Sequence, residues 1–190
     1  MAIFAYTVRC NFAPPEFEAS WHEWYNGHKV HELVNKPQFL AGQRFAASGL
    51  DQRRKYLALW FVSSPEAFAT PEYRADWGFK QWTPHITDWS RDLFAAPPEA
   101  QHAAFDVGTG EALYVIAADG LDAEAARAAQ ARVARLRPGV TWLTSVGLDR
   151  HAPLLGLERL AGGARPAPLA DPAGLTETIF APIGARVHHG

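Results

Sequence analysis

The chain contains a single cysteine, Cys10, among its 190 residues. One cysteine excludes an intramolecular disulfide and a zinc cluster built on several cysteines, so we expect a reducing, cytoplasmic environment. The sequence also lacks an apolar run approaching the ~20 residues that cross a membrane. Its opening segment, MAIFAYTVRC, shows no basic stretch followed by an apolar core and a small-residue cleavage site, so no secretory leader is expected.

An excess of charge of either sign is missing as well. The formal net charge is -2 at pH 7, and lysine and arginine form no stripe, which argues against binding to DNA or RNA. Common catalytic motifs are absent: there is no nucleophile elbow, no glycine-rich phosphate loop before a predicted helix and no His-Glu-x-x-His zinc motif. Cys10 falls within a predicted strand and has no evident activating base. Aromatic residues and histidines remain as the main chemical signal.

The first half of the chain has the pattern of a folded α+β unit. Hydrophobic residues make up 48% of the sequence and aromatic residues 12%, as is typical of a globular protein. Strands are predicted at 2–12, 40–49, 54–64 and 90–96, the middle two forming an antiparallel hairpin. Large residues from Tyr56 to Val62 indicate a central strand with both faces covered. A helix is predicted from Glu16 to Pro37, and one or two short helices within 64–82.

The order of elements begins again after an aperiodic connector at 96–110. A strand at 111–119, a helix at 122–136 with Asp122 as N-cap, and strands at 140–151 and 175–184 are predicted, with a loop at 165–174. No second helix is evident in this half. We therefore divide the chain into an N-terminal half (1–95), the connector (96–110) and a C-terminal half (111–190), a pseudo-repeat that is either separate or one compact unit with the first.

The repeated order of strand, helix, hairpin, helix and strand predicts an α+β fold made of two ferredoxin-like, split βαβ halves. Each antiparallel sheet then needs cover on the face that its helices leave free. The two halves meet this need if their sheets pack together or close into an eight-stranded barrel with the helices outside. Pairing of two copies in a homodimer is the alternative.

Residues 16–35 concentrate aromatic side chains and histidines on one face of the predicted helix. At 100° per residue, one stripe holds Phe17, Trp21, Trp24, His28, His31 and Asn35. Packing in the core is an alternative explanation for the tryptophans. It explains the histidines less well, because a buried imidazole needs hydrogen-bond partners, which a pocket for a small molecule supplies. We expect the wheel to break at Asn26 and Gly27, because glycine weakens a helix by ~1 kcal/mol. His22 points away from the stripe.

Three segments resemble the EthD-like group of the dimeric α+β barrel superfamily: EWYNGHKVHELVNKPQFLAGQRF, KYLALWFVSSPEAFATPEY and RDLF. The features of that group fall on Trp24, Tyr25, His28, Pro37, Phe39, Arg44, Phe45, Ser64, Pro65, Thr70, Pro71 and Tyr73. Gln38 stands where the group usually has glycine, and His31 is not part of its pattern. The resemblance covers about residues 1–95 and implies a ferredoxin-like fold with a ligand pocket between the sheet and the first helix. It implies no single reaction, because the superfamily includes isomerases, monooxygenases and haem enzymes.

The leading hypothesis is a cofactor-free isomerase or lyase that moves a proton next to the carbonyl of an apolar, aromatic or polyketide-like metabolite. His28 is expected to move the proton, because imidazole accepts and returns protons near neutral pH. Arg44 is expected to hold a carboxylate or enolate oxygen. The predicted substrate-binding residues are Phe17, Trp21, Trp24, Tyr25, His31, Tyr6, Trp60, Tyr73 and Trp77.

Several alternatives stay open at this point. Arg44 is equally well explained by a surface salt bridge, and Tyr73 and Trp77 by core packing. The protein as a whole could be a non-catalytic ligand-binding accessory protein of a catabolic or biosynthetic operon, or a cofactor-free, haem-dependent or metal-dependent monooxygenase. We expect no cofactor, no metal, no nucleic-acid or membrane partner, a homodimer as one possible assembly, and a frayed tail at the carboxyl-terminal histidine pair.

Overall fold

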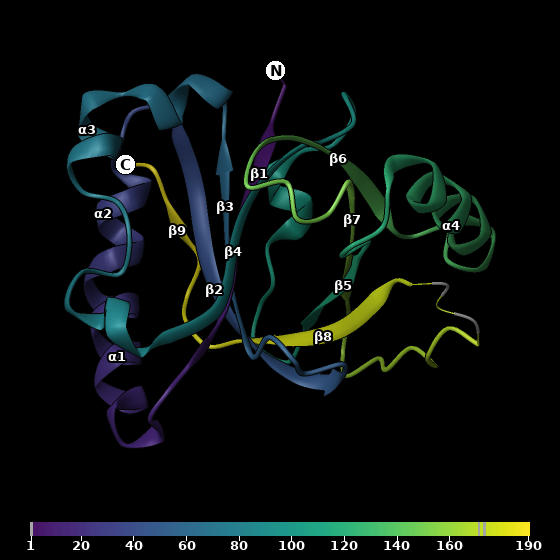
Figure 1. Cartoon of the computed structure of the whole chain (residues 1–190), viewed down its shortest axis with the longest axis horizontal. Coiled ribbons are helices and arrows are strands. Elements are labelled where there is room, and N and C mark those ends of the chain that lie inside the picture. The colour runs from purple at the N-terminus through teal and green to yellow at the C-terminus, as the bar shows by residue number, and fades with distance from the viewer. Residues whose placement is uncertain (1, 171, 173) are drawn as a thin grey trace.

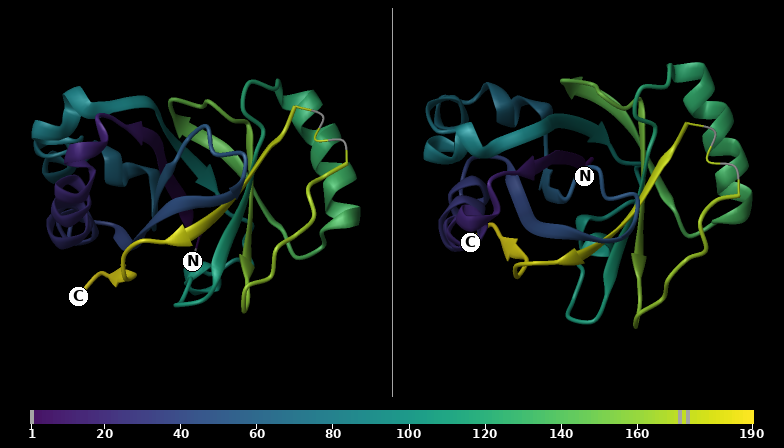
Figure 2. Two further views of the ribbon diagram at one scale, coloured as in Figure 1. Left: turned by 90° about the horizontal axis from the view of Figure 1, so that it is seen from below. Right: turned by 60° about the horizontal axis from the view of Figure 1, so that its bottom comes forward.

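Strands of the chain close into a barrel without help from a second copy. The computed structural model describes residues 2–170, 172 and 174–190. Its strands are β1 (Phe4–Phe12), β2 (Phe39–Leu50), β3 (Tyr56–Val62), β4 (Ile86–Ala95), β5 (Ala112–Ala117), β6 (Thr141–Leu148), β7 (Leu154–Leu160), β8 (Thr176–Pro182) and β9 (Val187–His188). The order β3-β1-β4-β6-β7-β5-β8-β2, closed by pairing of β2 with β3, forms an antiparallel eight-stranded barrel in this part of the chain (Figure 1 and Figure 2).

The two halves of the chain contribute neighbouring arcs of this barrel. Strands β4, β1, β3 and β2 come from the N-terminal half, and β8, β5, β7 and β6 from the C-terminal half. The arcs join where β2 pairs with β8 and β4 with β6, while the short β9 adds to β2 through Ala41 and Gly42. The predicted α+β fold with a closed antiparallel barrel is confirmed. The domain boundaries stay a prediction. The homodimer also stays a prediction, since the barrel closes within one chain.

Packed side chains fill the interior of the barrel. Apolar residues from both arcs meet there, with phenylalanines contributing most of the bulk: Phe45, Phe61, Phe94, Phe105 and Phe180. All five are at most 2% exposed. Close packing of this kind contributes most of the stability of a small barrel and leaves little space for a ligand. We therefore expect a binding site between the barrel wall and the helices that cover it.

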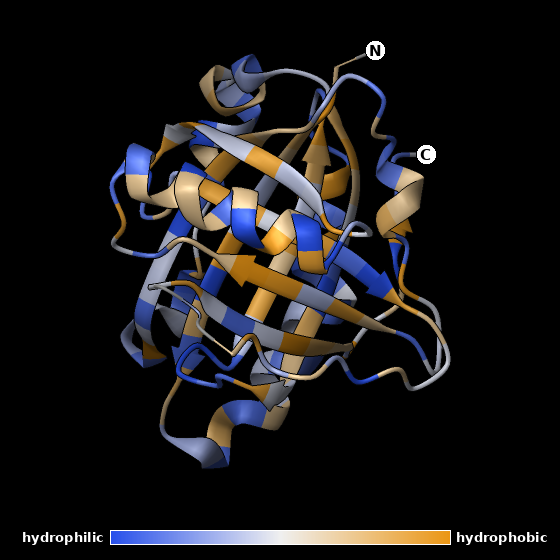
Figure 3. Ribbon diagram, turned by 90° about the vertical axis from the view of Figure 1, so that its right-hand side faces the viewer, coloured by the Kyte–Doolittle hydropathy of each residue, from blue (hydrophilic) through white to orange (hydrophobic). Residues whose placement is uncertain are grey.

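Helices cover two opposite faces of the barrel (Figure 1). On the N-terminal side lie α1 (Glu18–Trp24), a π-turn (Tyr25–Lys29), α2 (Val30–Val34) and α3 (Pro71–Ala75), with 3-10 turns at Pro15–Phe17, Pro65–Ala69 and Lys80–His85. The connector forms one more 3-10 turn, His102–Phe105. On the C-terminal side, α4 (Ala123–Leu136) lies across the strands (Figure 3). As predicted, the Asp122 side chain caps α4 by accepting hydrogen bonds from two backbone N–H groups.

Local sequence patterns locate most elements, and the exceptions have physical causes. The expected helical region at 64–82 is split into α3 and two 3-10 turns, and β7 was not predicted. Gln38 adopts φ 69°, in the left-handed region that favours glycine, which is the residue that the EthD-like pattern has at this position. The predicted loop at 165–174 lies partly outside the described residues.

Two findings bear on the environment of the protein. In the part of the chain that the structure describes, no helix combines the length and hydropathy needed to cross a membrane. Cys10 is a free thiol inside β1, and burial raises its pKa to about 12, so it is protonated and a poor nucleophile at neutral pH.

Candidate functional site

A π-turn in the first helix determines which side chains face the sheet. Residues Tyr25–Lys29 bond i to i+5, which inserts extra chain into the helix and rotates every later position. The inward positions therefore follow a spacing of four: Trp21, Tyr25, Lys29 and Leu33, all at most 4% exposed. The expected break at Asn26 and Gly27 is confirmed in place, and it takes the form of this turn.

The rotation moves His28 out of the position that sequence periodicity predicts. Its side chain is 66% exposed, and its Nε2 lies 3.6 Å from Oε2 of Glu32. The expectation that His28 faces a pocket is wrong. Phe17 is likewise at the surface, 45% exposed beside His85, and Trp24 is half-buried against Trp82. Phe17 and His28 are therefore surface residues, whereas Trp24 packs against the edge of the core.

Four buried aromatic rings form a continuous wall between the helix and the sheet. Tyr6 stacks on Trp60 at 5.2 Å between centroids, Trp60 stacks on Tyr25 at 6.3 Å, and Tyr25 meets Trp21 edge-on at 5.7 Å. Gly42 makes this packing possible, because a Cβ there would lie 2.6 Å from Nε1 of Trp60. We call these four rings the aromatic wall. Two openings adjoin it.

The first opening, the tyrosine cleft, lies where Tyr6, Tyr25, Lys29, Trp60, Trp77 and Arg91 come together. The hydroxyls of Tyr6 and Tyr73 are 3.2 Å apart, and burial raises the pKa of both. Trp77 is 43% exposed and stacks under the Arg91 guanidinium. The cleft has a volume of about 20 Å³, roughly one water molecule, so it gathers predicted site residues but holds no substrate in this form.

The second opening is a cavity of about 450 Å³ between the π-turn, α2 and the end of the chain. Asn26, Val30, His31 and Arg44 line it, together with residues 184–188. A volume of this size is typical of small-molecule sites. We call it the Arg44 cavity. Of the residues predicted from sequence, it brings together Arg44 and His31, the latter in place of His28.

The carboxyl-terminal segment forms a wall of this cavity and is not frayed. The backbone N–H of Ile183 donates to the carbonyl oxygen of Arg44 at 3.0 Å, and the N–H of His189 donates to that of Leu40 at 2.9 Å. The Asn26 side chain donates to the carbonyl oxygen of Ile183 at 2.7 Å. Asn26 and residues 184–188 are not among the residues predicted from the sequence, because only pairing between distant segments brings them to the site.

Arg44 is buried, with 2% of its surface exposed, and its polar neighbours are neutral. Its Nη1 donates to Oδ1 of Asn26 at 3.0 Å, and its Nη2 to Nδ1 of His22 at 3.2 Å. Its guanidinium carbon lies 4.0 Å and 4.5 Å from the ring centroids of Tyr25 and Trp21. No carboxylate of residues 2–170, 172 or 174–190 pairs with it, so the surface salt-bridge alternative is wrong.

The pKa values of Arg44 and His22 leave the positive charge of Arg44 in place at neutral pH. Burial lowers the pKa of Arg44 to about 10, so the guanidinium is still cationic at neutral pH. Burial, and then the charge of Arg44, lower the pKa of His22 to about 4, so this imidazole is neutral and its Nδ1 accepts the hydrogen bond. The cavity therefore presents one fixed positive charge.

The helical layer of the C-terminal half has a different composition. Under α4, the side chains of Ile116, Ala126, Ala129 and Val133 pack into a closed apolar cluster. The Tyr114 hydroxyl in this layer donates to Glu177, so its polar group is satisfied. The layer under α4 is therefore packed with apolar side chains, whereas the helical layer of the N-terminal half contains polar and titratable side chains around a cavity.

Comparison with protein-family models finds no match, and no curated protein matches the sequence. Solved structures do match over nearly the whole chain. An anthrone oxidase-like protein superposes with a TM-score of 0.59 at 11% identity, covering 100% of this chain and 94% of its own. A proposed monooxygenase from Lactobacillus acidophilus NCFM gives 0.53 at 9%, covering 100% and 98%. A proposed chlorite dismutase gives 0.53 at 7%, covering 96% and 95%.

The chain shares with these three structures the α+β fold with a closed antiparallel barrel. At identities of 7% to 11% the likeness concerns the fold alone, and the EthD-like subgroup is not confirmed. The three neighbours are described as oxidase-like, monooxygenase and dismutase proteins, and none of them as an isomerase or lyase.

Proposed function

We propose that the protein is an enzyme that acts on a small carbonyl compound in the Arg44 cavity. One observation carries the proposal: a cavity of about 450 Å³ brings a buried guanidinium, an amide and an imidazole together, from Arg44, Asn26 and His31. The equivalent layer of the C-terminal half is filled with apolar side chains. Apolar walls with a few convergent polar groups are the usual form of a substrate site.

The chemistry of these groups suits removal of a proton next to a carbonyl. His31 is the proton acceptor, because it lines the cavity and imidazole exchanges protons near neutral pH. Arg44 stabilises the negative charge that then develops on the carbonyl oxygen, since its guanidinium is already fixed in place and partly desolvated. Asn26 holds that guanidinium and is itself held by Ile183.

Oxidation by O₂ is the fate of the resulting enolate that we favour over isomerisation or lyase chemistry. An enolate is electron-rich enough to reduce O₂ directly. In the balanced reaction R₂CH₂ + O₂ → R₂C=O + H₂O, the substrate supplies all the electrons, one oxygen atom enters the product, and the other leaves as water. No outside reductant is needed. The neighbours described as anthrone oxidase-like and as a proposed monooxygenase support this choice.

Oxygen uptake with anthrone and smaller enolisable aromatic ketones tests the proposal. We expect O₂ consumption and ketone oxidation to keep a one-to-one ratio, and His31→Asn to lower the rate about 10²–10⁴-fold. His28→Asn is the matched control, since His28 and His31 are both exposed histidines of the same helical segment and only His31 lines the cavity. Loss of activity in His28→Asn but not in His31→Asn would move the reaction away from the cavity.

A non-catalytic role makes a different prediction in the same assay. A binding protein would take up the ketones without oxidising or isomerising any of them. A cytoplasmic location is retained as part of the proposal, because the free, buried Cys10 suits a reducing compartment.

A further inference from the structure

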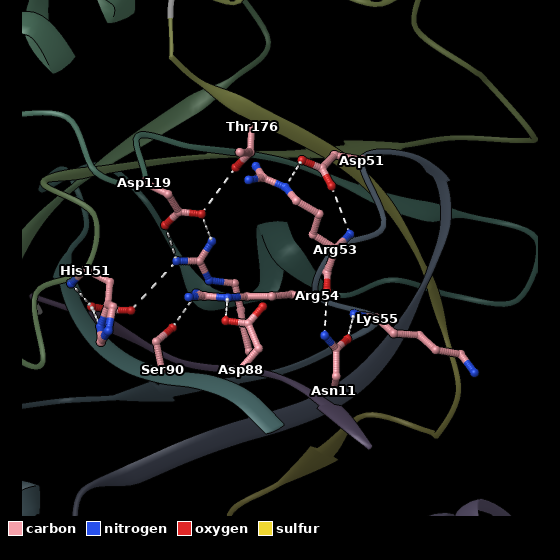
Figure 4. A network of polar contacts seen from close by, with 12 residues as sticks. Asn11, Asp51, Arg53, Arg54, Lys55, Asp88, Ser90, Asp119, His151 and Thr176 are labelled. Carbon is pink, nitrogen blue, oxygen red and sulfur yellow. Dashed lines mark hydrogen bonds and ion pairs between the residues drawn. The ribbon is translucent and has the colours of Figure 1, made fainter. Parts of the chain in front are cut away.

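Two arginines stand among the buried residues of the described chain, Arg9 at 5% and Arg44 at 2% exposure. Arg9 lies at one mouth of the barrel, where Asp119, which is labelled in Figure 4, accepts hydrogen bonds of 2.8 and 2.6 Å from the two Nη atoms of Arg9. A second carboxylate, Asp92, is 3.8 Å from the same guanidinium. The charge of Arg9 is thus fully compensated.

Neighbouring arginines at the barrel mouth are compensated in the same way. Arg53 pairs with Asp51 at 2.7 Å, and Arg54 lies 3.5 Å from Asp88 (Figure 4). Arg44 differs from all of them, because the contacts of its guanidinium with the described residues are to Asn26, His22 and aromatic rings, and none is to a carboxylate. Removing a cation from water without a counter-charge is unfavourable by several kcal/mol. A partner absent from the chain itself explains why such a group is retained.

The hydrogen bonds of Arg44 leave donors for that partner. A guanidinium has five N–H donors in a rigid fork, and Asn26 and His22 accept from one each. These two contacts fix the plane of the fork, so a planar oxygen anion can bind without further ordering of the side chain. A second arginine, Arg186, also lines the cavity, but its positive charge is neutralised by an ion pair with Asp106.

We propose that the Arg44 cavity binds an apolar, aromatic compound carrying a single planar oxygen anion, which supplies the counter-charge that Arg44 lacks. This inference rests on the proposed function in that it names the substrate class of the same site. A carboxylate and an enolate share the required sp² oxygen. The apolar side chains of Val30 and Val187 favour an aromatic anion over inorganic phosphate, which would bring more charge than one guanidinium neutralises.

Calorimetric titration at constant ionic strength tests this inference, with benzoate and inorganic phosphate as probes. We expect benzoate to bind more tightly than phosphate, and Arg44→Met to weaken benzoate binding at least 10-fold. Arg44→Lys, which keeps the charge but loses the fork, should give an intermediate affinity. Arg165→Gln is the matched control, because it removes an exposed arginine from the neighbouring surface and should leave the affinity unchanged. Circular dichroism confirms that each variant is folded.

A second arm separates the two sources of the anion. Bound anthrone showing enolate absorbance below the pH at which free anthrone ionises supports an enolate, and binding of benzoate alone supports a carboxylate. Equal benzoate affinity in wild type and Arg44→Met, no benzoate binding, or phosphate binding as tightly as benzoate would each overturn the inference. Benzoate binding lost in Arg44→Met, without turnover of any ketone by the wild type, would leave it standing and defeat the proposed function.

Discussion

The barrel mouth and the Arg44 cavity each bury an arginine, yet the surroundings of the two side chains differ completely. At the mouth, Arg9 joins β1 to Asp119 after β5 and to Asp92 on β4, so its ion pairs tie the two arcs of the barrel together. In the cavity, Arg44 has neutral partners only. Burial of a charge is therefore no sign of function by itself, and the identity of its partners separates a structural site from a binding site.

The largest effect is expected from Arg9→Met. The change leaves the buried Asp92 and the partly exposed Asp119 without their cation, and breaking a buried pair costs about 3–5 kcal/mol of unfolding free energy. Urea unfolding followed by fluorescence measures it. The double variant with Asp119→Asn should recover part of the loss, and a loss below about 1 kcal/mol would show that the network at the mouth is not what joins the arcs.

A smaller loss is expected when the aromatic wall is disturbed. In Gly42→Ala the new Cβ would meet the Trp60 ring and Val34, so the wall must shift, at about 1–3 kcal/mol. Gly27→Ala is the control, because nothing lies within 4 Å of a Cβ there and a helical glycine is replaced, which should be neutral or stabilising by about 0.5–1 kcal/mol. Equal losses in both variants would contradict the packing of the wall.

The response to acid is expected to depend on His22. Its pKa of about 4 in the folded protein lies below the ordinary histidine value of 6.5, so the unfolded chain binds more protons between these limits and stability falls as pH drops from 6.5 to 4. Solvent screening of this half-exposed group limits the effect to on the order of 1 kcal/mol. Glu18, Lys55 and Arg44 are the charged groups that act on it. Urea midpoints of His22→Gln should decline less over this range, and equal slopes would contradict a neutral His22.

The smallest change in stability is expected from Arg44→Met in the absence of any ligand. Removing a buried, uncompensated charge offsets the lost stacking on Tyr25 and Trp21, so the unfolding free energy should stay within about 1 kcal/mol of wild type or rise. The contrast with Arg9→Met is the informative quantity. A loss as large as that of Arg9→Met would show that Arg44 is held by structural partners.

Much of the fold follows from local patterns, and the parts that do not depend on distant contacts. Strand-forming residue types located β1 to β3, and the N-cap at Asp122 located α4. Strand β7 carries Gly156 and two charged residues, and its glycine is needed because a Cβ would lie 2.7 Å from Val140. The two-residue β9 exists only through pairing with β2, which no local pattern reveals.

In the candidate site, too, the residue types were predictable from the sequence, whereas the direction in which each side chain points was not. Of the aromatic residues expected between the first helix and the sheet, Tyr6, Tyr25 and Trp60 meet there, whereas Phe17 is exposed. His28 was predicted to face the pocket from a helical wheel with a constant 100° per residue. The π-turn inserts extra chain and rotates the later positions, which this constant angle does not describe. Arg44 was recognised by residue type, while its lack of a carboxylate is visible only in three dimensions.

Titration of ¹⁵N-labelled protein with benzoate, followed through the arginine side-chain Nε–H resonances, tests the central claim most directly because it reports both buried arginines in one sample. The account predicts a saturable shift of the Arg44 resonance while that of Arg9, already paired with Asp119, stays in place. An Arg44 resonance that does not respond, or one that moves no more than that of Arg9, would contradict a cavity built around an unmatched positive charge.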